Sequence, residues 1–201
     1  MRLIAVTNNQ MTTERLIDTL LAIESSIDAV ILREKSKTDA KVIDLIEQLK
    51  ESRFDTSKII VHGRADIAAM TGIEKVQLPG HGAPLPLAKK QFPALSFGRS
   101  VHSFEEAEAA YTAGAEWLLY GHVFATDSKE GLPPRGTEEL FQIVESLPIP
   151  VYAIGGIQPD HLLALKQNGV AGFAIMSSIF GHANPRKAAD GYREVQNVAK
   201  G

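Results

Sequence analysis

Short, mostly apolar runs of about four residues recur along the whole chain. Such runs are typical of parallel strands that are buried on both faces. Polar residues, glycine or proline follow each of them. The runs are 3–6, 29–32, 58–61, 75–78, 95–98, 117–120, 151–154 and 173–176. Their spacing predicts eight strands, each followed by a segment long enough for a helix.

The segments between these runs carry apolar residues at helical spacing. After Thr12, for example, Leu16, Ile17 and Leu20 fall on one face of a helix. Alternating strands and helices require a parallel sheet, and eight such units favour a closed barrel over an open sheet. No linker divides the chain. The sequence therefore predicts an α/β fold, a small (β/α)8 TIM barrel, with residues 1–201 forming a single domain.

Glycines and serines stand where the last two predicted strands end. In barrels of this kind, catalytic groups lie at the carboxyl ends of the strands, and phosphate often binds after strands seven and eight. Gly155 and Gly156 follow one run, and Ser177 and Ser178 follow the next. Glycines let the backbone approach a ligand closely, and free amides with hydroxyls suit a phosphate. We predict a phosphate site at these four residues.

Basic side chains at other strand ends indicate an anionic ligand. They are Arg33, Lys35 and Arg99. Few carboxylates accompany them, so we expect a positively charged mouth. The alternative is that these cations pair with acids inside the fold, namely Glu34, Asp66 or Asp127.

His122 stands between the sixth predicted strand and a long loop, residues 123–136. Imidazole titrates near neutral pH, so it can accept and return a proton in one turnover. Connections of this length are often binding loops or lids. We predict that His122 is a catalytic group that faces the phosphate site across the open rim. The alternative is a structural histidine.

The other histidines rank lower as catalytic candidates. His62 and His102 also follow predicted strands, whereas His81, His161 and His182 are expected on the surface or in loops. No HxH or HExxH spacing occurs, and no pair of carboxylates accompanies the histidines. The sequence predicts no metal site.

Composition excludes several classes of function. The chain has 201 residues, 44% of them hydrophobic and 22% charged, with a formal net charge of −3. That charge gives no electrostatic case for nucleic acid or an anionic membrane. There are no cysteines, hence no disulfide and no thiolate metal site. No apolar run is long enough to span a bilayer or to form a signal peptide, so we expect a cytoplasmic protein.

Five segments in register resemble the thiamin phosphate synthase superfamily. They are LREKS (32–36), GRADIA (63–68), GRSVHSFEEAEAA (98–110), YGHVFATDSKEG (120–131) and the glycine- and serine-bearing stretch 150–180. Together they cover nearly the whole chain in the order of the family. The resemblance implies a (β/α)8 barrel, in agreement with the strand count.

Two activities occur in that superfamily, and the sequence departs from one of them. The synthase joins a pyrimidine pyrophosphate to a thiazole phosphate with Mg²⁺, and its pattern places an Asp where this chain has Gly63. The loop 79–84, where a second Asp is expected, contains no carboxylate. Mg²⁺ binds mainly through carboxylate and phosphate oxygens. The motif from Gly121 to Asp127 instead matches Gly-His-Val-Phe-x-Thr-Asp of the TenI-type thiazole tautomerases.

The tautomerase resemblance implies a proton transfer that makes a carboxythiazole-ylidene ethyl phosphate aromatic, without redox change, hydrolysis or cofactor. It implies that His122 carries the proton. It also implies that amides around the four predicted phosphate-site residues hold the phosphate. Candidates for contact with the carboxylate or the ring are Arg33, Ser100 and His102.

Three alternatives stay open at this point. The first is a divergent Mg²⁺-dependent thiamin phosphate synthase. The second is a non-catalytic regulatory protein that binds a thiazole phosphate. The third is a generic phosphosugar barrel enzyme, for which Lys35 and Asp127 are the available acid–base groups. The resemblance also points to a homodimer, with Leu85, Leu87 and Phe92 as exposed apolar candidates for its surface.

Overall fold

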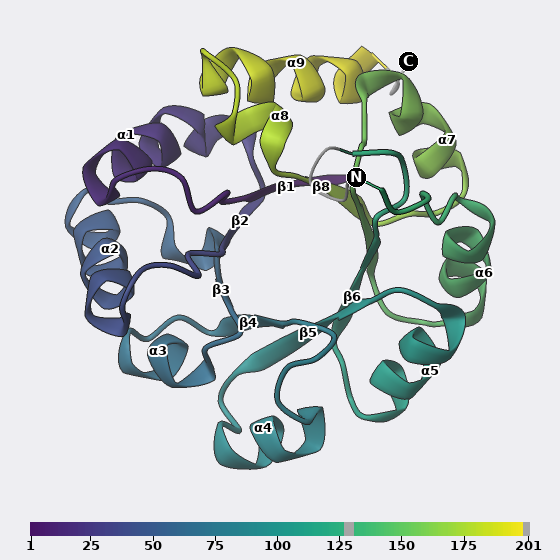
Figure 1. Ribbon diagram of the computed structural model, residues 1–201, viewed down its shortest axis with the longest axis horizontal. Helices are drawn as coiled ribbons and strands as arrows, with labels where there is room; N and C mark the ends of the chain where they lie inside the picture. Colours follow the sequence, from purple (N-terminus) through teal and green to yellow (C-terminus); the bar gives the residue numbers. More distant parts are fainter. Residues whose placement is uncertain (127–130, 199–201) are drawn as a thin grey trace.

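The computed structural model describes residues 1–126 and 131–198 and shows a closed barrel of parallel strands surrounded by helices (Figure 1). The strands are β1 (Arg2–Val6), β2 (Ala29–Leu32), β3 (Ile59–His62), β4 (Lys75–Leu78), β5 (Ser96–Val101), β6 (Trp117–Gly121), β7 (Val151–Ile154) and β8 (Gly172–Ile175). They follow one another around the barrel in chain order, and β8 pairs with β1 to close it. The predicted (β/α)8 architecture is confirmed.

The helices lie outside the strands. They are α1 (Thr13–Ile23), α2 (Asp39–Glu51), α3 (Ala65–Met70), α4 (Leu85–Gln91), α5 (Phe104–Thr112), α6 (Glu138–Ser146), α7 (Leu162–Gln167), α8 (Ser177–Phe180) and α9 (Pro185–Val198), with short 3₁₀ turns at Glu24–Ser26, Thr56–Lys58 and Pro159–His161. Capping by side chains fixes several starts. The Thr12 hydroxyl accepts from the amide of Arg15, and the Thr38 hydroxyl accepts from that of Lys41.

Alternation along the strands separates two apolar cores. On β1, Leu3 and Ala5 face the helices, whereas Ile4 and Val6 face the barrel interior. The interior cluster also takes one buried residue from each of several other strands: Ile31, Ile60, Leu119, Tyr152 and Ala174. These side chains fill the interior of the barrel, so the space for a ligand lies above them, at the carboxyl ends of the strands.

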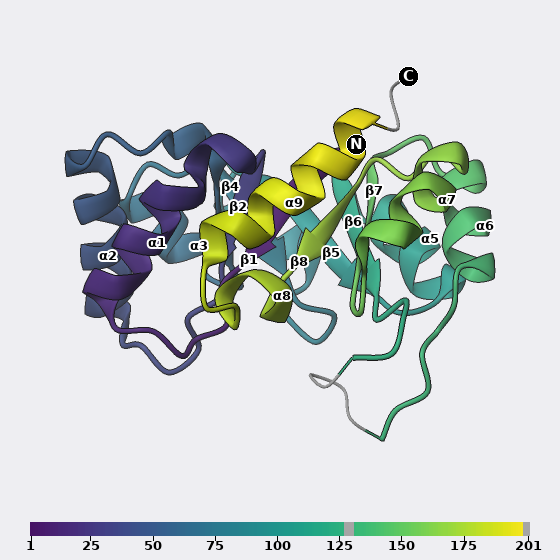
Figure 2. The same cartoon turned by 90° about the horizontal axis from the view of Figure 1, so that it is seen from above.

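Ser177 and Ser178 follow β8 as expected and begin the short helix α8. The Met176 carbonyl accepts from the amides of Ile179 and Phe180 and starts the helix. The final helix α9 packs on α1 and α8. Figure 2 shows the described residues that follow β6, 122–126 and 131–136, extending from one end of the barrel, whereas the N-terminus and the last turn of α9 lie near the other end.

The expected apolar dimer surface is largely wrong. Leu85 is buried at 3% exposure, and Phe92 packs against the core, which leaves Leu87 as the exposed member. In the part of the chain that is described, no helix has the length and apolar character needed to cross a membrane.

Candidate active site

A cavity of about 490 Å³ opens at the carboxyl ends of the strands, and every strand or the loop after it contributes lining residues. Its floor is apolar and consists of interior residues that also belong to the barrel core: Val6, Ile31, Leu119, Ile154 and Ala174. Polar groups stand above this floor on two sides. The cavity therefore suits a small ligand with an apolar ring and polar substituents.

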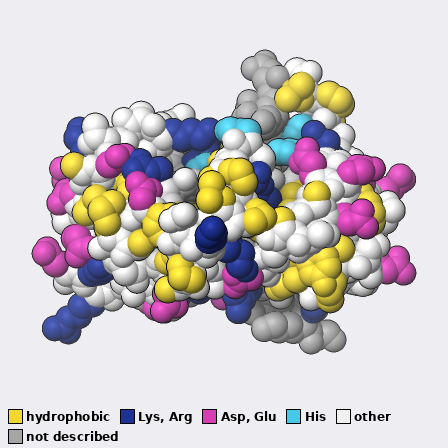
Figure 3. Space-filling view, turned by 90° about the horizontal axis from the view of Figure 1, so that it is seen from below, with side chains coloured by type: hydrophobic (Ala, Val, Ile, Leu, Met, Phe, Trp, Pro, Cys, Tyr) yellow, Lys and Arg dark blue, Asp and Glu magenta, His cyan; other side chains and the backbone are white. Residues whose placement is uncertain are grey.

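We call one side of the cavity the side-chain wall. It comes from β2 to β5 and the loops that follow them, and its members are Arg33, His62, Gln77, His81, Ser100 and His102. Figure 3 shows histidine side chains gathered beside Lys and Arg at one edge of the molecule. In the part of the chain that the structure describes, no Asp or Glu lines the cavity.

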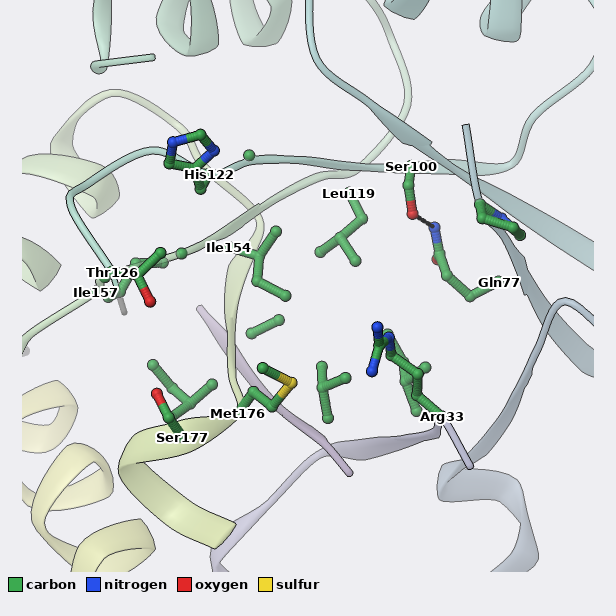
Figure 4. Close-up of a pocket in the computed structure, with 18 of the residues that line it drawn as sticks. Arg33, Gln77, Ser100, Leu119, His122, Thr126, Ile154, Ile157, Met176 and Ser177 are labelled. Atoms are coloured by element: carbon green, nitrogen blue, oxygen red, sulfur yellow. Dashed lines mark hydrogen bonds between the residues drawn. The ribbon is translucent and has the colours of Figure 1, made fainter. Parts of the chain in front are cut away.

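We call the opposite side the backbone wall. It comes from β6 to β8 and the segments that follow them, and its members are Gly121, His122, Gly155, Gly156, Ser177 and Ser178. The structure thus brings His122, the four predicted phosphate-site residues and the three candidates for contact with the carboxylate or ring to one cavity, on two opposite walls. Figure 4 shows Arg33 on one side, with His122 and Ser177 on the other.

Arg33 reaches into the cavity from the end of β2 (Figure 4). Its amide donates to the Thr7 hydroxyl at 2.8 Å, which anchors the backbone at the strand end. Among the described residues, no carboxylate lies within ion-pair distance of its guanidinium. The charge of Arg33 is therefore available to an anionic ligand.

The acids proposed as alternative partners are engaged elsewhere. Glu34 is buried and pairs with Lys37, and Asp66 pairs with Arg64 at 2.6 Å. Asp127 lies outside the described residues. None of the described acids neutralises Arg33.

The prediction that Arg99 contributes charge to the mouth is wrong. Arg99 does not line the cavity, and its guanidinium donates to the carbonyls of Gly80 and Ala83 at 2.7 and 2.9 Å. The residue alternates outward on β5 between Gly98 and Ser100, so its side chain holds the loop after β4 instead. Lys35 is exposed and does not line the cavity either.

His62 is a neutral member of the side-chain wall. Burial, and to a smaller extent the nearby charges of Arg33, Lys35 and His81, together lower its pKa to about 4. A neutral imidazole at pH 7 can donate or accept one hydrogen bond at each nitrogen. The shift also shows that this wall is electropositive.

His102 is held by the helix that follows it. Its amide donates to a Glu106 carboxylate oxygen at 2.8 Å, and its Nδ1 lies 3.2 Å from the same oxygen. The Ser103 hydroxyl accepts from the Glu106 amide and caps α5. Arg135 donates to the His102 carbonyl from the far end of the loop after β6. Glu106 therefore engages Nδ1 of a residue that lines the cavity and leaves Nε2 outside this contact.

His122 borders the cavity but lies deeper than an open rim, since only 7% of the residue is exposed. Among the described residues, no partner bonds its buried Nε2. A buried polar atom without a partner is costly and often marks the place of a water or a ligand. The expectation of a rim position is corrected. The catalytic role of His122 stays a prediction.

Three glycines let the loops after β6 and β7 touch. A Cβ on Gly121 would lie 2.1 Å from the Ile154 carbonyl oxygen, and one on Gly155 would lie 2.4 Å from the His122 Cβ. Gly156 has a φ of +64°, and its Cβ would lie 2.2 Å from the Ala125 carbonyl oxygen. The Phe124 amide donates to the Gly155 carbonyl at 2.9 Å. The glycine pair therefore places His122, in addition to lining the predicted phosphate site.

The serines of the backbone wall differ from each other. Ser177 and Ser178 start α8, so their amides have no acceptor within that helix. Near Ser178, the Tyr192 hydroxyl donates to the Ile157 carbonyl at 2.9 Å, and burial raises the Tyr192 pKa. Ser177 is exposed at the cavity. Amides from both serines and the hydroxyl of Ser177 are thus the groups available to an anion.

The residues present do not fit the Mg²⁺ ion that the synthase branch requires. Within residues 1–126 and 131–198, no cluster of three or more His, Cys, Asp or Glu side chains has the arrangement of a metal site. Asp66 is the nearest acid in sequence to the loop after β3, and Arg64 holds both of its oxygens at 2.6 and 2.9 Å. Mg²⁺ needs carboxylate oxygens that are free to coordinate it.

Sequence reasoning missed several lining residues. His81 was expected on the surface, and Met176, Thr126 and Gln158 were not singled out, yet all of them line the cavity. For Met176 a signal existed, because it continues the inward alternation of Ala174 on β8. His161 stacks on Phe124 with ring centroids 3.7 Å apart, which no pattern in the sequence indicates.

Comparison with known proteins identifies the family. Residues 3–179 match the family described as thiamine monophosphate synthase. The chain is 35% identical over 175 residues to the thiamine-phosphate synthase of Pyrococcus furiosus, covering 87% of this chain and 84% of the relative. It is 33% identical to the enzyme of that name from Haloarcula marismortui, with 92% of each chain covered.

Solved structures agree. A thiamine phosphate pyrophosphorylase from Pyrococcus furiosus superposes with a TM-score of 0.83 at 32% identity, covering 100% of this chain and 97% of that one. A 3-hexulose-6-phosphate synthase superposes with a TM-score of 0.75 at 19% identity, covering 97% of this chain and 99% of that one, and shows the shared fold alone. The chain belongs to the thiamine monophosphate synthase family.

Proposed function

We propose that this member of the family is a thiazole tautomerase of thiamine biosynthesis. It takes a non-aromatic carboxythiazole-ylidene ethyl phosphate and returns the aromatic carboxythiazole ethyl phosphate. The C–H bond at the ring carbon breaks, its electron pair completes the aromatic ring, and a new C–H bond forms at the exocyclic carbon. No atom is gained or lost, so neither a metal nor a redox cofactor is needed.

The observation that carries this proposal is the composition of the cavity. Its described lining holds histidines, one free arginine and small hydroxyl and amide groups, but no Asp or Glu. An isomerisation by proton transfer needs one titrating group in reach of the ring, whereas a pyrophosphate condensation needs a metal held by carboxylates. This lining suits the first demand better.

His122 is the proposed proton carrier. Its Nε2 is buried, lacks a partner among the described residues, and belongs to the backbone wall where we place the phosphate. A ligand whose phosphate contacts Gly156 and Ser177 would lay its ring over the apolar floor. General acid–base catalysis by such a group contributes about 10²–10⁴ in rate.

The remaining groups orient the substrate. We assign the phosphate to the amides around Gly155, Gly156, Ser177 and Ser178. We assign the carboxylate to the side-chain wall, where Arg33 supplies a charge and Ser100 and His102 supply hydrogen bonds. Opposite walls for the two anionic ends would hold the ring between them with its reacting carbons fixed.

The second candidate is the activity in the names of the curated relatives, condensation by a thiamine-phosphate synthase. Identity of about one third to those proteins favours it. Its difficulty is the missing carboxylate set at the described part of the cavity. A regulatory protein would bind a thiazole phosphate at the same site without converting it.

Two assays on the purified protein separate these functions. In the first, the ylidene tautomer is followed spectroscopically in the presence of EDTA. In the second, pyrimidine pyrophosphate, thiazole phosphate and Mg²⁺ are supplied, and thiamin phosphate is measured. Turnover in the first alone is the expected result. Turnover in the second alone would establish a synthase, and binding of the thiazole phosphate without turnover in either would establish a binding protein.

A further inference from the structure

A partly buried chain of hydrogen bonds links the barrel interior to the side-chain wall. The Trp117 indole N–H donates to the Gln77 Oε1 at 2.7 Å, and the Gln77 Nε2 donates to the Ser100 Oγ at 3.1 Å (Figure 4 shows the second bond). Gln77 is fully buried, and Ser100 lines the cavity. We call these three residues the relay. They come from neighbouring strands β4, β5 and β6.

Gly98 makes room for the relay. A Cβ at this position would lie 1.9 Å from the Trp117 Nε1 and 2.1 Å from its Cε2. The indole therefore occupies the interior space that a side chain at position 98 would fill. The glycine of β5 and the tryptophan of β6 are directly paired in the sheet, so the two positions act as one unit.

The direction of every bond in the relay is fixed by its first member. An indole nitrogen is only a donor, so the Gln77 atom that faces it must be the amide oxygen. The Gln77 amino group is then directed at Ser100, whose oxygen accepts. A hydroxyl that accepts in this way has its own proton left to donate. Among the described residues, no second partner bonds the Ser100 Oγ.

We propose that the relay keeps the Ser100 proton free to donate into the cavity and so favours a ligand with an acceptor at this point. Gln77 and Trp117 are positioning residues that act through Ser100. Given the proposed function, on which this step rests, the acceptor is a carboxylate oxygen of the carboxythiazole. A serine beside an acceptor could turn its proton away from a ligand, whereas the Gln77 amino group that faces Ser100 offers that proton no acceptor.

Gln77→Glu tests this proposal, because it replaces the donor that faces Ser100 by an acceptor with almost no change of shape. A carboxylate at position 77 accepts from both Trp117 and Ser100, so the Ser100 proton is no longer available to the ligand. Gln77→Met is the matched control. It removes both relay bonds but leaves the hydroxyl free to donate. The probes are the aromatic carboxythiazole ethyl phosphate and its counterpart without the carboxylate, titrated calorimetrically.

We expect Gln77→Glu to weaken binding of the carboxylated probe about ten- to a hundredfold, and Gln77→Met to weaken it only about threefold. Negative charge alone would also repel an anionic probe, so both substitutions are repeated with Ser100→Ala. When Ser100 is replaced by alanine, Gln77→Glu should reduce the affinity by at most a fifth of the fold-loss that it causes when Ser100 is present. The reason is that the hydrogen bond that Gln77→Glu redirects no longer exists.

Trp117 supplies an independent readout as the one tryptophan of the sequence. Its indole N–H resonance should shift when the carboxylated probe saturates the wild type, and should not shift at saturation of Ser100→Ala. Equal losses from Gln77→Glu in both backgrounds, or a larger loss from Gln77→Met, would overturn the relay while the proposed function stands. Failure of the wild type to bind either probe would overturn both.

Discussion

The two walls of the cavity are built on different physical principles. The side-chain wall consists of long polar side chains from β2 to β5 that stand on ordinary strand backbone. The backbone wall consists of glycines, serines and one buried histidine where loops from β6 and β7 touch. The side-chain wall would recognise a ligand through separate functional groups, each of which can be replaced without changing the others. The backbone wall depends on the absence of side chains, so that a single added carbon disturbs several groups together.

This difference predicts how the walls respond to mutation. Changes on the side-chain wall should alter affinity step by step. Changes on the backbone wall should alter the position of His122 and lose catalysis abruptly, since a displacement of about 1 Å can cost a hundredfold in rate.

Gly155→Ala should disturb folding and turnover together. The added Cβ meets the His122 Cβ at 2.4 Å, and the φ of +102° is unfavourable for any L-residue. We expect a loss of about 2–4 kcal/mol in unfolding free energy and at least about a hundredfold in turnover. Urea denaturation and the tautomer assay measure the two effects.

Gly72→Ala is the matched control for that variant. Gly72 also has a positive φ, +63°, but nothing lies within 4 Å of its Cβ position. Backbone strain alone should cost about 1–2 kcal/mol, with turnover unchanged. If Gly155→Ala were no worse than Gly72→Ala, the contact with His122 would have no energetic weight and the account of the backbone wall would fail.

His62 should make folding stability depend on pH. Its pKa of about 4 in the folded protein is below the ordinary 6.5, so the unfolded chain binds a proton first as the pH falls. Stability from neutral His62 is present above pH 6.5 and is lost as the pH falls toward 4. Between pH 7 and pH 5 the loss is about 2 kcal/mol.

The measurement is urea denaturation of the wild type and His62→Asn at both pH values. The variant should lose about 2 kcal/mol less than the wild type over this interval. His182→Asn, at a histidine that bonds only locally to Asn184 among the described residues, serves as the control. Identical pH dependence in His62→Asn and the wild type would show that His62 titrates normally.

Arg33→Gln should raise the KM about tenfold and leave kcat nearly unchanged, because it removes one charge-assisted bond to a substrate oxygen. Steady-state kinetics of the tautomer assay measure both constants. Arg186→Gln, far along the chain on the exposed side of α9, is the charge-matched control and should change neither. A large fall in kcat for Arg33→Gln would mean that the side-chain wall takes part in the chemical step.

His161→Ala should have the smallest effect. Its ring stacks on Phe124, which lies two residues after His122, and stacked pairs contribute about 0.5–1.5 kcal/mol. We expect turnover to fall about threefold, because the segment 122–126 that carries His122 becomes less rigid. A threefold loss corresponds to the lower part of the energy range of a stacked pair. Phe124→Ala should reproduce the loss, and the double variant should add nothing. Additive losses would show that the stack does not support the backbone wall.

The fold was predictable because its determinants are local. Each strand is a short apolar run, each helix has its stripe, and closure of eight units follows from their number. Strand ends such as His62, Ser100 and Gly155 could be assigned to one cavity because a barrel gathers them at one end. The sequence did not show whether each side chain at a strand end points into the cavity or away from it. Arg99 and Ser100 are adjacent in sequence, but one holds a loop outside and the other faces the cavity.

The parts of the site that escaped prediction depend on contacts between distant segments. The depth of His122 follows from the approach of Gly155, and the engagement of His102 follows from Glu106 and Arg135. The hydrogen bonds of Gln77 join three strands. None of these leaves a periodic trace in the sequence, because each depends on the packing of side chains after the barrel has closed.

The central claim is that His122 carries a proton in a cavity that needs no metal. The most direct test compares the rate of the tautomer conversion in the wild type and in His122→Asn, each with EDTA and with Mg²⁺. The account predicts equal wild-type rates in both conditions and a loss of about 10²–10⁴ in a variant that still unfolds at the wild-type urea concentration. An undiminished rate in His122→Asn, or a wild-type rate abolished by EDTA and restored by Mg²⁺, would contradict it.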